Sequence, residues 1–295
     1  MVNLNISNPI FQKLIKLKLL KKNRLKILSN ETRDKKIRVL QDTFSKIIFL
    51  EKDINNKKRY ANKPSSDYVN ILKTIKKRKF LDDDKKRLNV FKSFIKNKSI
   101  LDYGCGFGGF LHLSKKYSKN SEGFEVMKIC QNFIKKRNII KINTKKMELT
   151  NKKFDTIFLF HVLEHLSKPV DELIFLRKIL KKKGKLIIEV PHALDLLINC
   201  QELESFRKFT FWSEHLILHT KESLKKFLIN SGFKKIRFLD YQRYNIENHI
   251  NWFIKNKPNG HKKPLFKIDH KTKKNYEKYL YSNNSTDTLV VVASK

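Results

Sequence analysis

From residue 99 onward, the hydrophobic positions of the chain alternate between two spacings. Short apolar runs rich in β-branched residues, typical of buried parallel strands, are followed by stretches in which apolar positions recur every third or fourth residue, as in amphipathic helices. This alternation predicts a doubly wound α/β fold, with a mostly parallel seven-stranded sheet and helices on both faces. The predicted strands are Ser99–Tyr103, Glu122–Val126, Ile139–Ile142, Thr156–Phe160, Lys185–Val190, Lys235–Tyr241 and Thr288–Ala293, and the predicted helices are Gly108–Tyr117, Met127–Arg137, Val170–Lys181 and Lys221–Ser231.

The first 80 residues have a different pattern and are predicted to form a small N-terminal extension. The apolar positions between Asn8 and Ser29 fall on one face of a basic amphipathic helix. This helix either packs on its own protein or makes a peripheral contact with an anionic membrane. Two strand-like runs within residues 36–52 predict a small β-hairpin.

Residues 81–295 are predicted to form the α/β domain, with a capping insertion at 242–286. Further helices are expected near Tyr68–Lys77 and Asp84–Lys96, after a polar stretch at 55–67 that is expected to be a loop. The insertion is polar and aromatic, and it is long for a connection inside a compact domain, which favours a functional cap.

The composition narrows the class of protein. The three cysteines include no C-x-x-C pair, so neither a disulfide framework nor a zinc ribbon is indicated, and no metal site is expected. No apolar run approaches the length of a membrane span, and a reducing cytoplasm is the expected compartment. The net charge of +38 suggests a nucleic-acid partner. Lysine greatly outnumbers arginine, however, and most lysines fall on polar helix faces, so a solvated surface is the favoured interpretation.

A glycine-rich turn follows the first strand of the predicted sheet. Gly104, Gly106 and Gly109 fit the dinucleotide fingerprint G-x-G-x-x-G, and Glu125 lies at the distance where such sites place an acid for a ribose hydroxyl. Asp102, two residues before the first glycine, argues against a dinucleotide, because a pyrophosphate gains nothing from a nearby carboxylate whereas an ammonium group does.

The segment from Ile100 to Gly108 resembles the first motif of class I S-adenosylmethionine-dependent methyltransferases. The stretches 154–166 and 183–191 resemble the fourth- and fifth-strand motifs of the same family, whose fold is Rossmann-like. One departure is that residues 143–148 contain no aspartate for the adenine amino group. The resemblance implies cofactor contacts by Asp102, Gly104, Cys105, Gly106 and Gly108 at the methionine end, Glu125 and Val126 at the ribose, Met147 near the adenine, and Phe160 and His161 along the methionine part.

The acceptor side is expected after the fifth strand. The segment 209–224 resembles the part of nucleotide-sugar C-methyltransferases that carries a glutamate-histidine dyad, which implies Glu214 and His215 as the proton-accepting pair. A buried hydrogen bond of His215, ahead of a helix capped by Thr220 and Ser223, is the alternative. Leu163, Glu164 and His165 are expected to lock a loop without carrying chemistry. The residues expected to contact the acceptor are His192, Trp212, Arg243, Asn248 and His249.

These features predict an enzyme that methylates a nucleotide-linked sugar or a related glycan precursor, and the chain also resembles methyltransferases of surface-polysaccharide biosynthesis. An RNA methyltransferase, a small-molecule O-methyltransferase of quinone-precursor type, and a binding module that has lost catalysis remain alternatives.

Overall fold

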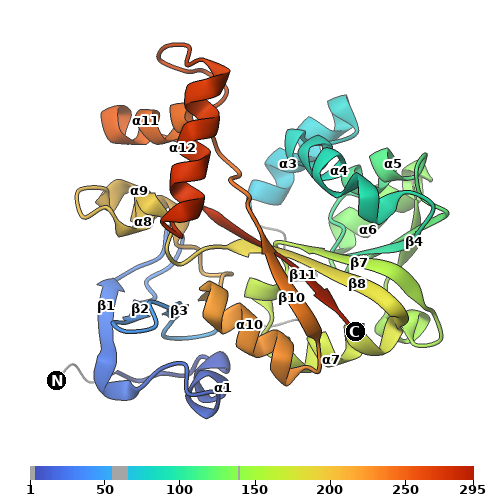
Figure 1. The fold of residues 1–295 in the computed structure, drawn as a ribbon, viewed down its shortest axis with the longest axis horizontal. Helices are drawn as coiled ribbons and strands as arrows, with labels where there is room; N and C mark the ends of the chain where they lie inside the picture. Colours follow the sequence, from blue (N-terminus) through green and yellow to red (C-terminus); the bar gives the residue numbers. More distant parts are fainter. Residues whose placement is uncertain (1–3, 55–65, 139) are drawn as a thin grey trace.

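The computed structural model describes residues 4–54, 66–138 and 140–295, and its centre is a seven-stranded sheet. The strand order is β10-β11-β8-β7-β4-β5-β6, and within this described sheet β11 runs in the direction opposite to the other strands. The predicted α/β fold is therefore confirmed (Figure 1). The strands are β4 Ser99–Tyr103, β5 Asn120–Phe124, β6 Lys141–Asn143, β7 Phe154–Phe160, β8 Leu180–Pro191, β10 Lys234–Leu239 and β11 Thr288–Ser294.

Helices cover both faces of this sheet because the side chains of its central strand alternate between two hydrophobic clusters. Phe158 and Phe160 of β7 pack with the helices on one face, whereas Ile157 and Leu159 pack with those on the other. The first group of helices is α4 Asp82–Ile95, α5 Gly109–Ser114 and α6 Lys128–Arg137, and the second is α7 Pro169–Ile179 and α10 Lys221–Asn230.

Some bounds differ from those expected. β8 begins at Leu180, inside the predicted helix Val170–Lys181, because the buried Leu180 pairs with Phe154 at the start of β7. β6 begins at Lys141, and residue 139, where this strand was predicted to start, lies outside the described residues, as does most of the polar stretch 55–67. The helices predicted near Tyr68–Lys77 and Asp84–Lys96 are α3 Ser66–Arg78 and α4.

The predicted helix Asn8–Ser29 is wrong. α1 covers only Ile10–Lys16, after which Lys18 takes a positive φ of 54°, and β1 Leu25–Ser29 is a strand. The apolar face of α1 packs inward, where the ring of Phe11 stacks on that of Phe49 at 5.8 Å, which agrees with the alternative that this segment packs on its own protein. A peripheral membrane contact stays a prediction. Within the described residues, no helix is long and apolar enough to cross a bilayer.

The predicted hairpin is present and belongs to a second, four-stranded sheet of order β1-β2-β3-β9. Its strands β2 Val39–Asp42 and β3 Ile48–Leu50 are antiparallel, and β3 pairs with β9 Ile217–Leu218 from the distant second half of the chain. The hydrophobic core runs without interruption from this sheet to the main one. The division of the chain at residue 80 stays a prediction.

The remaining elements are short or belong to the insertion. α11 Ile246–Lys255 and α12 His270–Ser282 lie beyond the main sheet, on the same side as α8 Leu196–Asn199 and α9 Glu204–Thr210 (Figure 1). Short 3₁₀ segments lie at Lys22–Arg24, Lys146–Leu149 and Leu163–His165.

Candidate active site

The glycine turn lies directly after β4, at the carboxyl edge of the parallel strands. Gly104, Gly106 and Gly108 have φ angles of +85°, +53° and +78°, which disfavour residues with a side chain. A Cβ on Gly104 would lie 2.4 Å from the side chain of Val162, so packing leaves no room for a side chain at this position. A Cβ on Gly106 would meet none of the described atoms within 4 Å, so here the backbone faces open space where a ligand can approach.

Glu125, expected at the ribose, is buried immediately after β5. One of its carboxylate oxygens accepts the N–H of Gly106 at 2.8 Å, and the other accepts those of Val126 and Met127 at 2.7 and 2.8 Å. A carboxylate accepts about four hydrogen bonds. Glu125 therefore joins the turn to the start of α6 and retains acceptor capacity for a ribose hydroxyl.

The environment of Asp102 indicates whether the turn can bind the positively charged end of a ligand. Its side chain is 3% exposed, and Oδ1 has no hydrogen-bond partner among the described residues. Burial raises the pKa of Asp102 to about 8, and the nearby charge of Arg87 only partly offsets this. A buried carboxylate with an unsatisfied oxygen fits an ammonium group, as the methionine end of the expected cofactor carries.

The other residues expected at the cofactor differ in exposure. Cys105 and Phe160 are buried, and a Cβ on Gly123 would lie 2.6 Å from the sulfur of Cys105. Val126 and Met147 are 41% and 80% exposed. The adenine contact expected near Met147 therefore lies at the surface and stays a prediction.

His161 lies at the carboxyl end of β7 in a strained backbone conformation, with a φ of 54°. Its Nδ1 is 3.1 Å from Glu164 Oε1, and its Nε2 is 3.1 Å from Glu189 Oε1. Burial would lower the pKa of His161, but the hydrogen bonds with these two carboxylates outweigh it and raise the pKa. His161 is thus placed to carry a positive charge at the edge where the ligand is expected.

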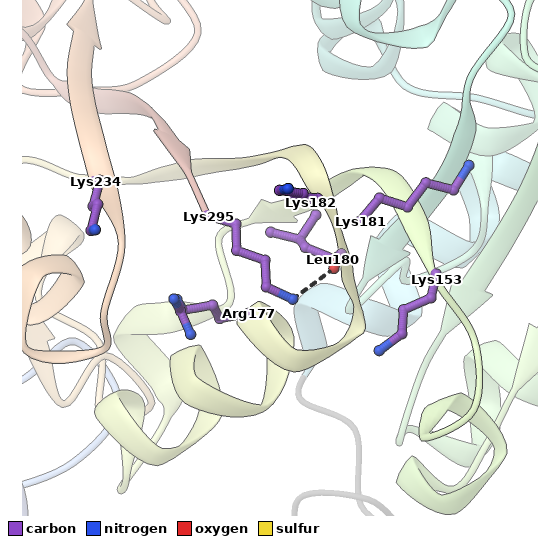
Figure 2. Close-up of a pocket in the computed structure, with 7 residues that line it drawn as sticks. All are labelled: Lys153, Arg177, Leu180, Lys181, Lys182, Lys234 and Lys295. Carbon is purple, nitrogen blue, oxygen red and sulfur yellow. Dashed lines mark hydrogen bonds between the residues drawn. The ribbon is translucent and has the colours of Figure 1, made fainter.

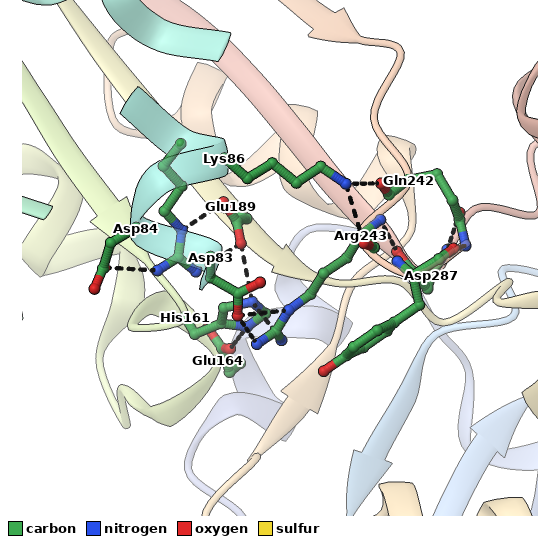
Figure 3. Close-up of polar contacts among 11 residues, drawn as sticks. Asp83, Asp84, Lys86, His161, Glu164, Glu189, Gln242, Arg243 and Asp287 are labelled. Atoms are coloured by element: carbon green, nitrogen blue, oxygen red, sulfur yellow. Dashed lines mark hydrogen bonds and ion pairs between the residues drawn. The ribbon is translucent and has the colours of Figure 1, made fainter. Parts of the chain in front are cut away.

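Charged side chains of α4 and the insertion surround His161 (Figure 3). Arg87 binds Glu189 through two N–H groups, at 3.0 and 2.7 Å. Arg243 pairs with Asp83, and its Nη1 lies 3.2 Å from His161 Nε2. Burial would raise the pKa of Glu189, but Arg87 and His161 outweigh it and hold this pKa low. The start of the insertion is therefore fixed over the end of β7 by the half-buried ion pair of Arg243 with Asp83.

A second cluster lies beside His161 and consists of Glu164, His165 and His215. Their potential ligand atoms all lie within 4.8 Å of one another. Burial would raise the pKa of Glu164, but the hydrogen bond from His161 and the nearby imidazoles outweigh it and lower the pKa to about 2. Burial, with the charge of His165, lowers the pKa of His215 to about 3. The cluster therefore joins an ionised carboxylate to neutral imidazoles.

The expected dyad is only partly reflected in this cluster. His215 is a member, and the carboxylate whose charge acts on its pKa is Glu164. Glu214 contributes its backbone carbonyl, which accepts a hydrogen bond from His165. The catalytic role of Glu214 and His215 stays a prediction.

The residues expected at the acceptor divide into two groups. Trp212 packs edge-on against His165 and His215, and Arg243 contacts His161, so both border the site. His192, Asn248 and His249 are 0%, 5% and 1% exposed and serve internal contacts. His192 Nδ1 donates to the carbonyl of Thr286 at 2.9 Å, Asn248 meets His261, and His249 meets Tyr276. The fold does not bring these three to an open surface.

Sequence reasoning missed the ion pairs of α4. Asp83 and Arg87 are one helical turn apart on α4, and Glu189 interrupts the apolar second half of β8, residues 186–191. A lone acid in a buried strand needs a partner, which is the signal that would have pointed to Arg87. Glu164 and His165, expected only to lock a loop, lie at the centre of the polar cluster.

Comparisons with known proteins agree with this geometry. A family model described as "Methyltransferase domain" matches residues 75–237. An uncharacterised protein of Methanocaldococcus jannaschii is 32% identical over 46% of this chain and 54% of its own length. A tRNA U34 carboxymethyltransferase of Glaesserella parasuis is 25% identical over 50% of this chain and 48% of its own. The chain thus spans about half the length of these curated relatives.

Two solved structures share the fold. A SAM-dependent methyltransferase from Archaeoglobus fulgidus superposes with a TM-score of 0.53 at 20% identity, covering 77% of this chain and 99% of its own. A second, from Thermotoga maritima, gives a TM-score of 0.51 at 17% identity, with coverages of 78% and 97%.

Proposed function

The chain belongs to the methyltransferase-domain family, and on that premise we propose that it transfers a methyl group to a nucleotide-linked sugar or a related glycan precursor. It is an enzyme with S-adenosylmethionine as its methyl donor. The carboxylates of Asp102 and Glu125 suit the ammonium and ribose of this donor, and the open backbone at Gly106 suits its close approach.

The observation that carries the proposal of a small acceptor is the contact between the insertion and the end of β7. Arg243 Nη1 reaches to 3.2 Å from His161 Nε2, and Lys86 of α4 donates to the carbonyls of Gln242 and Arg243 at 2.5 and 3.0 Å. A segment tied down at this place covers the acceptor side and favours a ligand small enough to fit beneath it. Arg243 and His161 offer positive charge to an anionic acceptor such as a sugar diphosphate.

The bound sulfonium supplies an electrophilic methyl group and a neutral leaving group, so the protein mainly has to align the acceptor atom. A hydroxyl or a carbon acid must also lose a proton as it is methylated. We propose that the cluster of Glu164, His165 and His215 promotes the loss of this proton from the acceptor. Trp212 packs beside the cluster and would form a wall of the acceptor site.

RNA is the second candidate acceptor, and one observation favours it besides the relatives named for tRNA. A cavity of about 560 Å³ is lined by Leu180 and six basic side chains, Lys153, Arg177, Lys181, Lys182, Lys234 and Lys295 (Figure 2). Lys153, Arg177 and Lys295 are held by backbone carbonyls, and Lys181 pairs with Asp155. A phosphate backbone would suit such a cavity.

The location of this cavity speaks against RNA as the methylated substrate. Lys153 precedes β7 and Lys295 follows the antiparallel β11, so the cavity lies at the amino edge of the parallel strands. The glycine turn lies at the opposite edge, roughly 20 Å away at about 3.3 Å per residue of β7. A phosphate bound in this cavity would not lie beside the donor.

The direct test is incubation with methyl-labelled S-adenosylmethionine and three separate pools: nucleotide sugars, total RNA and phenolic quinone precursors. We expect label in the nucleotide-sugar pool, and we expect Arg243→Ala to reduce this labelling while donor binding persists. Label in RNA that falls steeply with salt would overturn the sugar proposal, and label in the phenolic pool alone would assign the quinone-precursor class.

A further inference from the structure

Glu164, His165 and His215 supply one carboxylate and two imidazoles to a single point of the structure. Their potential ligand atoms lie within 4.8 Å of one another. Glu164 and His165 come from the 3₁₀ segment Leu163–His165, whereas His215 comes from a turn about 50 residues later in the chain. The N–H of Leu216 donates to the carbonyl of Glu164 at 2.9 Å, which fixes the turn carrying His215 against the short helix carrying the other two. The three side chains are thus held together by backbone contacts.

One of the potential ligand atoms, Oε2 of Glu164, has no hydrogen-bond partner among the described residues. Glu164 is fully buried, its Oε1 meets Nδ1 of His161 at 3.1 Å, and its Oε2 is buried without any described hydrogen-bond partner. A buried carboxylate oxygen without a partner is costly unless a cation or donor meets it. The arrangement leaves this oxygen for an occupant that the described residues do not supply.

The surroundings also match those of a metal ligand. His165 donates one ring N–H to the backbone carbonyl of Glu214, so its other nitrogen carries the lone pair when the ring is neutral. Ligating histidines are oriented by this kind of bond. Trp212 packs edge-on against both imidazoles, with ring centroids 5.9 and 5.3 Å away, and shields them on that side.

We propose that Glu164, His165 and His215 bind a zinc ion next to the methyl-transfer site. Two imidazoles and a carboxylate are a donor set that zinc takes in catalytic sites, where a fourth position stays open for water or substrate. Ligand atoms around zinc lie about 2.0–2.2 Å from the ion, so the three side chains would draw closer to one another when the ion binds. The half-buried histidines leave an entry path.

The zinc ion changes how the acceptor is activated, and this part rests on the proposed function. An acceptor hydroxyl in the open position would lose its proton to solvent more readily, because zinc lowers the pKa of bound oxygen groups. The oxygen then forms a bond to the methyl carbon, the carbon–sulfur bond breaks, and its electron pair returns to sulfur as a neutral thioether. His215 would act as a ligand, which excludes the proton-accepting role expected from sequence, because its lone pair is taken.

The test measures metal binding by the full chain. After chelator treatment, zinc is titrated by calorimetry, and Co²⁺ replaces it as a probe whose visible absorption reports the coordination number. We expect one ion per chain in the unmodified protein. Glu164→Gln and His215→Asn should each weaken zinc binding by more than about 100-fold, beyond what loss of a supporting hydrogen bond costs. His215→Cys, which offers a thiolate, should retain the ion.

Two control variants separate ligation from other effects. Glu214→Gln removes the neighbouring carboxylate without removing a ligand, and His270→Asn removes an exposed histidine; both should bind zinc as the unmodified protein does. Unchanged zinc binding in His215→Asn, or equal loss in the two controls, would overturn the site. Calorimetry with S-adenosylmethionine shows whether each variant is folded. Zinc binding without methylation of any nucleotide sugar would leave the metal site standing and overturn the acceptor class alone.

Discussion

At the scale of single residues, Glu125 ties the glycine turn to the start of α6, because its carboxylate accepts the N–H groups of Gly106, Val126 and Met127. If Glu125 also binds the ribose, as we propose, its loss opens the turn and removes that contact.

We therefore expect Glu125→Ala to weaken S-adenosylmethionine binding by about 100-fold or more, which corresponds to about 2.7 kcal/mol. Isothermal calorimetry measures this directly. Glu122→Ala is the matched control, because Glu122 lies on β5, which Glu125 follows directly, and pairs with Lys152 and Lys141 instead of the turn. An unchanged affinity in Glu125→Ala would remove the ribose assignment.

Burying the carboxyl group of Asp102, which we propose to bind the donor, makes the stability of the fold depend on pH. Its pKa is raised from 3.8 to about 8, so between these values the unfolded chain has lost a proton that the folded chain keeps. The contribution of Asp102 to stability is full below pH 3.8 and is lost as the pH rises towards 8.

Asp102→Asn should therefore gain stability relative to the unmodified protein between pH 5 and pH 8, by about 1.4 kcal/mol for each unit of pKa shift that persists. The same variant should bind the donor weakly at both pH values. Urea unfolding at the two pH values measures the difference, and a difference that stays constant would contradict the buried, unpaired state of Asp102.

The site residues differ in how far sequence could identify them. Asp102 and Glu125 follow from their distance to the glycines along the chain, since both lie at the ends of neighbouring parallel strands. The contact of Glu164 with His215 depends on the long-range hydrogen bond from the N–H of Leu216 to the carbonyl of Glu164, which local spacing does not encode. His192 and His249 look like surface ligands in the sequence, but tertiary packing buries both.

At the scale of elements, the main sheet was predictable because β4, β7, the second half of β8 and β11 are apolar runs. β4 has the predicted bounds, whereas β9 has only two residues and gives no periodic signal. The helix predicted over residues 8–29 failed because Leu19 and Leu20 continue the apolar spacing after the chain has turned at Lys18. Tertiary contacts with the hairpin then favour a strand at Leu25–Ser29.

α10 begins with a capping box formed by Thr220 and Ser223. Thr220 Oγ1 accepts the N–H of Ser223 at 3.3 Å, and Ser223 Oγ accepts that of Thr220 at 3.0 Å. Thr220→Ala should cost about 1 kcal/mol. We expect a fall in Tm of about 2–4 °C by calorimetric melting. The exposed Thr74 of α3 provides the control: its replacement by Ala should not lower the Tm, and an equal fall in both variants would contradict the capping role.

At the scale of the whole molecule, acid sensitivity follows from buried neutral histidines. Burial lowers the pKa of His192, His219 and His249 from 6.5 to about 4. Between pH 4 and pH 6.5 these histidines are protonated in the unfolded chain and neutral in the folded chain. Their neutral state therefore costs no stability above pH 6.5, and stability is lost as the pH falls towards 4.

His192→Asn tests this sign, because the amide can still donate to the carbonyl of Thr286. Denaturant unfolding between pH 7.5 and pH 5 should show a pH slope smaller by up to about 1.4 kcal/mol per unit than in the unmodified protein. His270→Asn, at an exposed position, should keep the original slope. A slope that is the same in both variants would show that His192 does not titrate in this range.

The pairing of β3 with β9 also sets an order of events during synthesis. β3 leaves the ribosome 167 residues before Ile217, and at 5–20 residues per second its partner arrives roughly 10–30 s later. During this interval the apolar edge of Ile48, Phe49 and Leu50 has no strand to complete it. Chaperones that recognise unpaired apolar strands would therefore meet the nascent chain first at this hairpin, and faster translation would shorten its exposure.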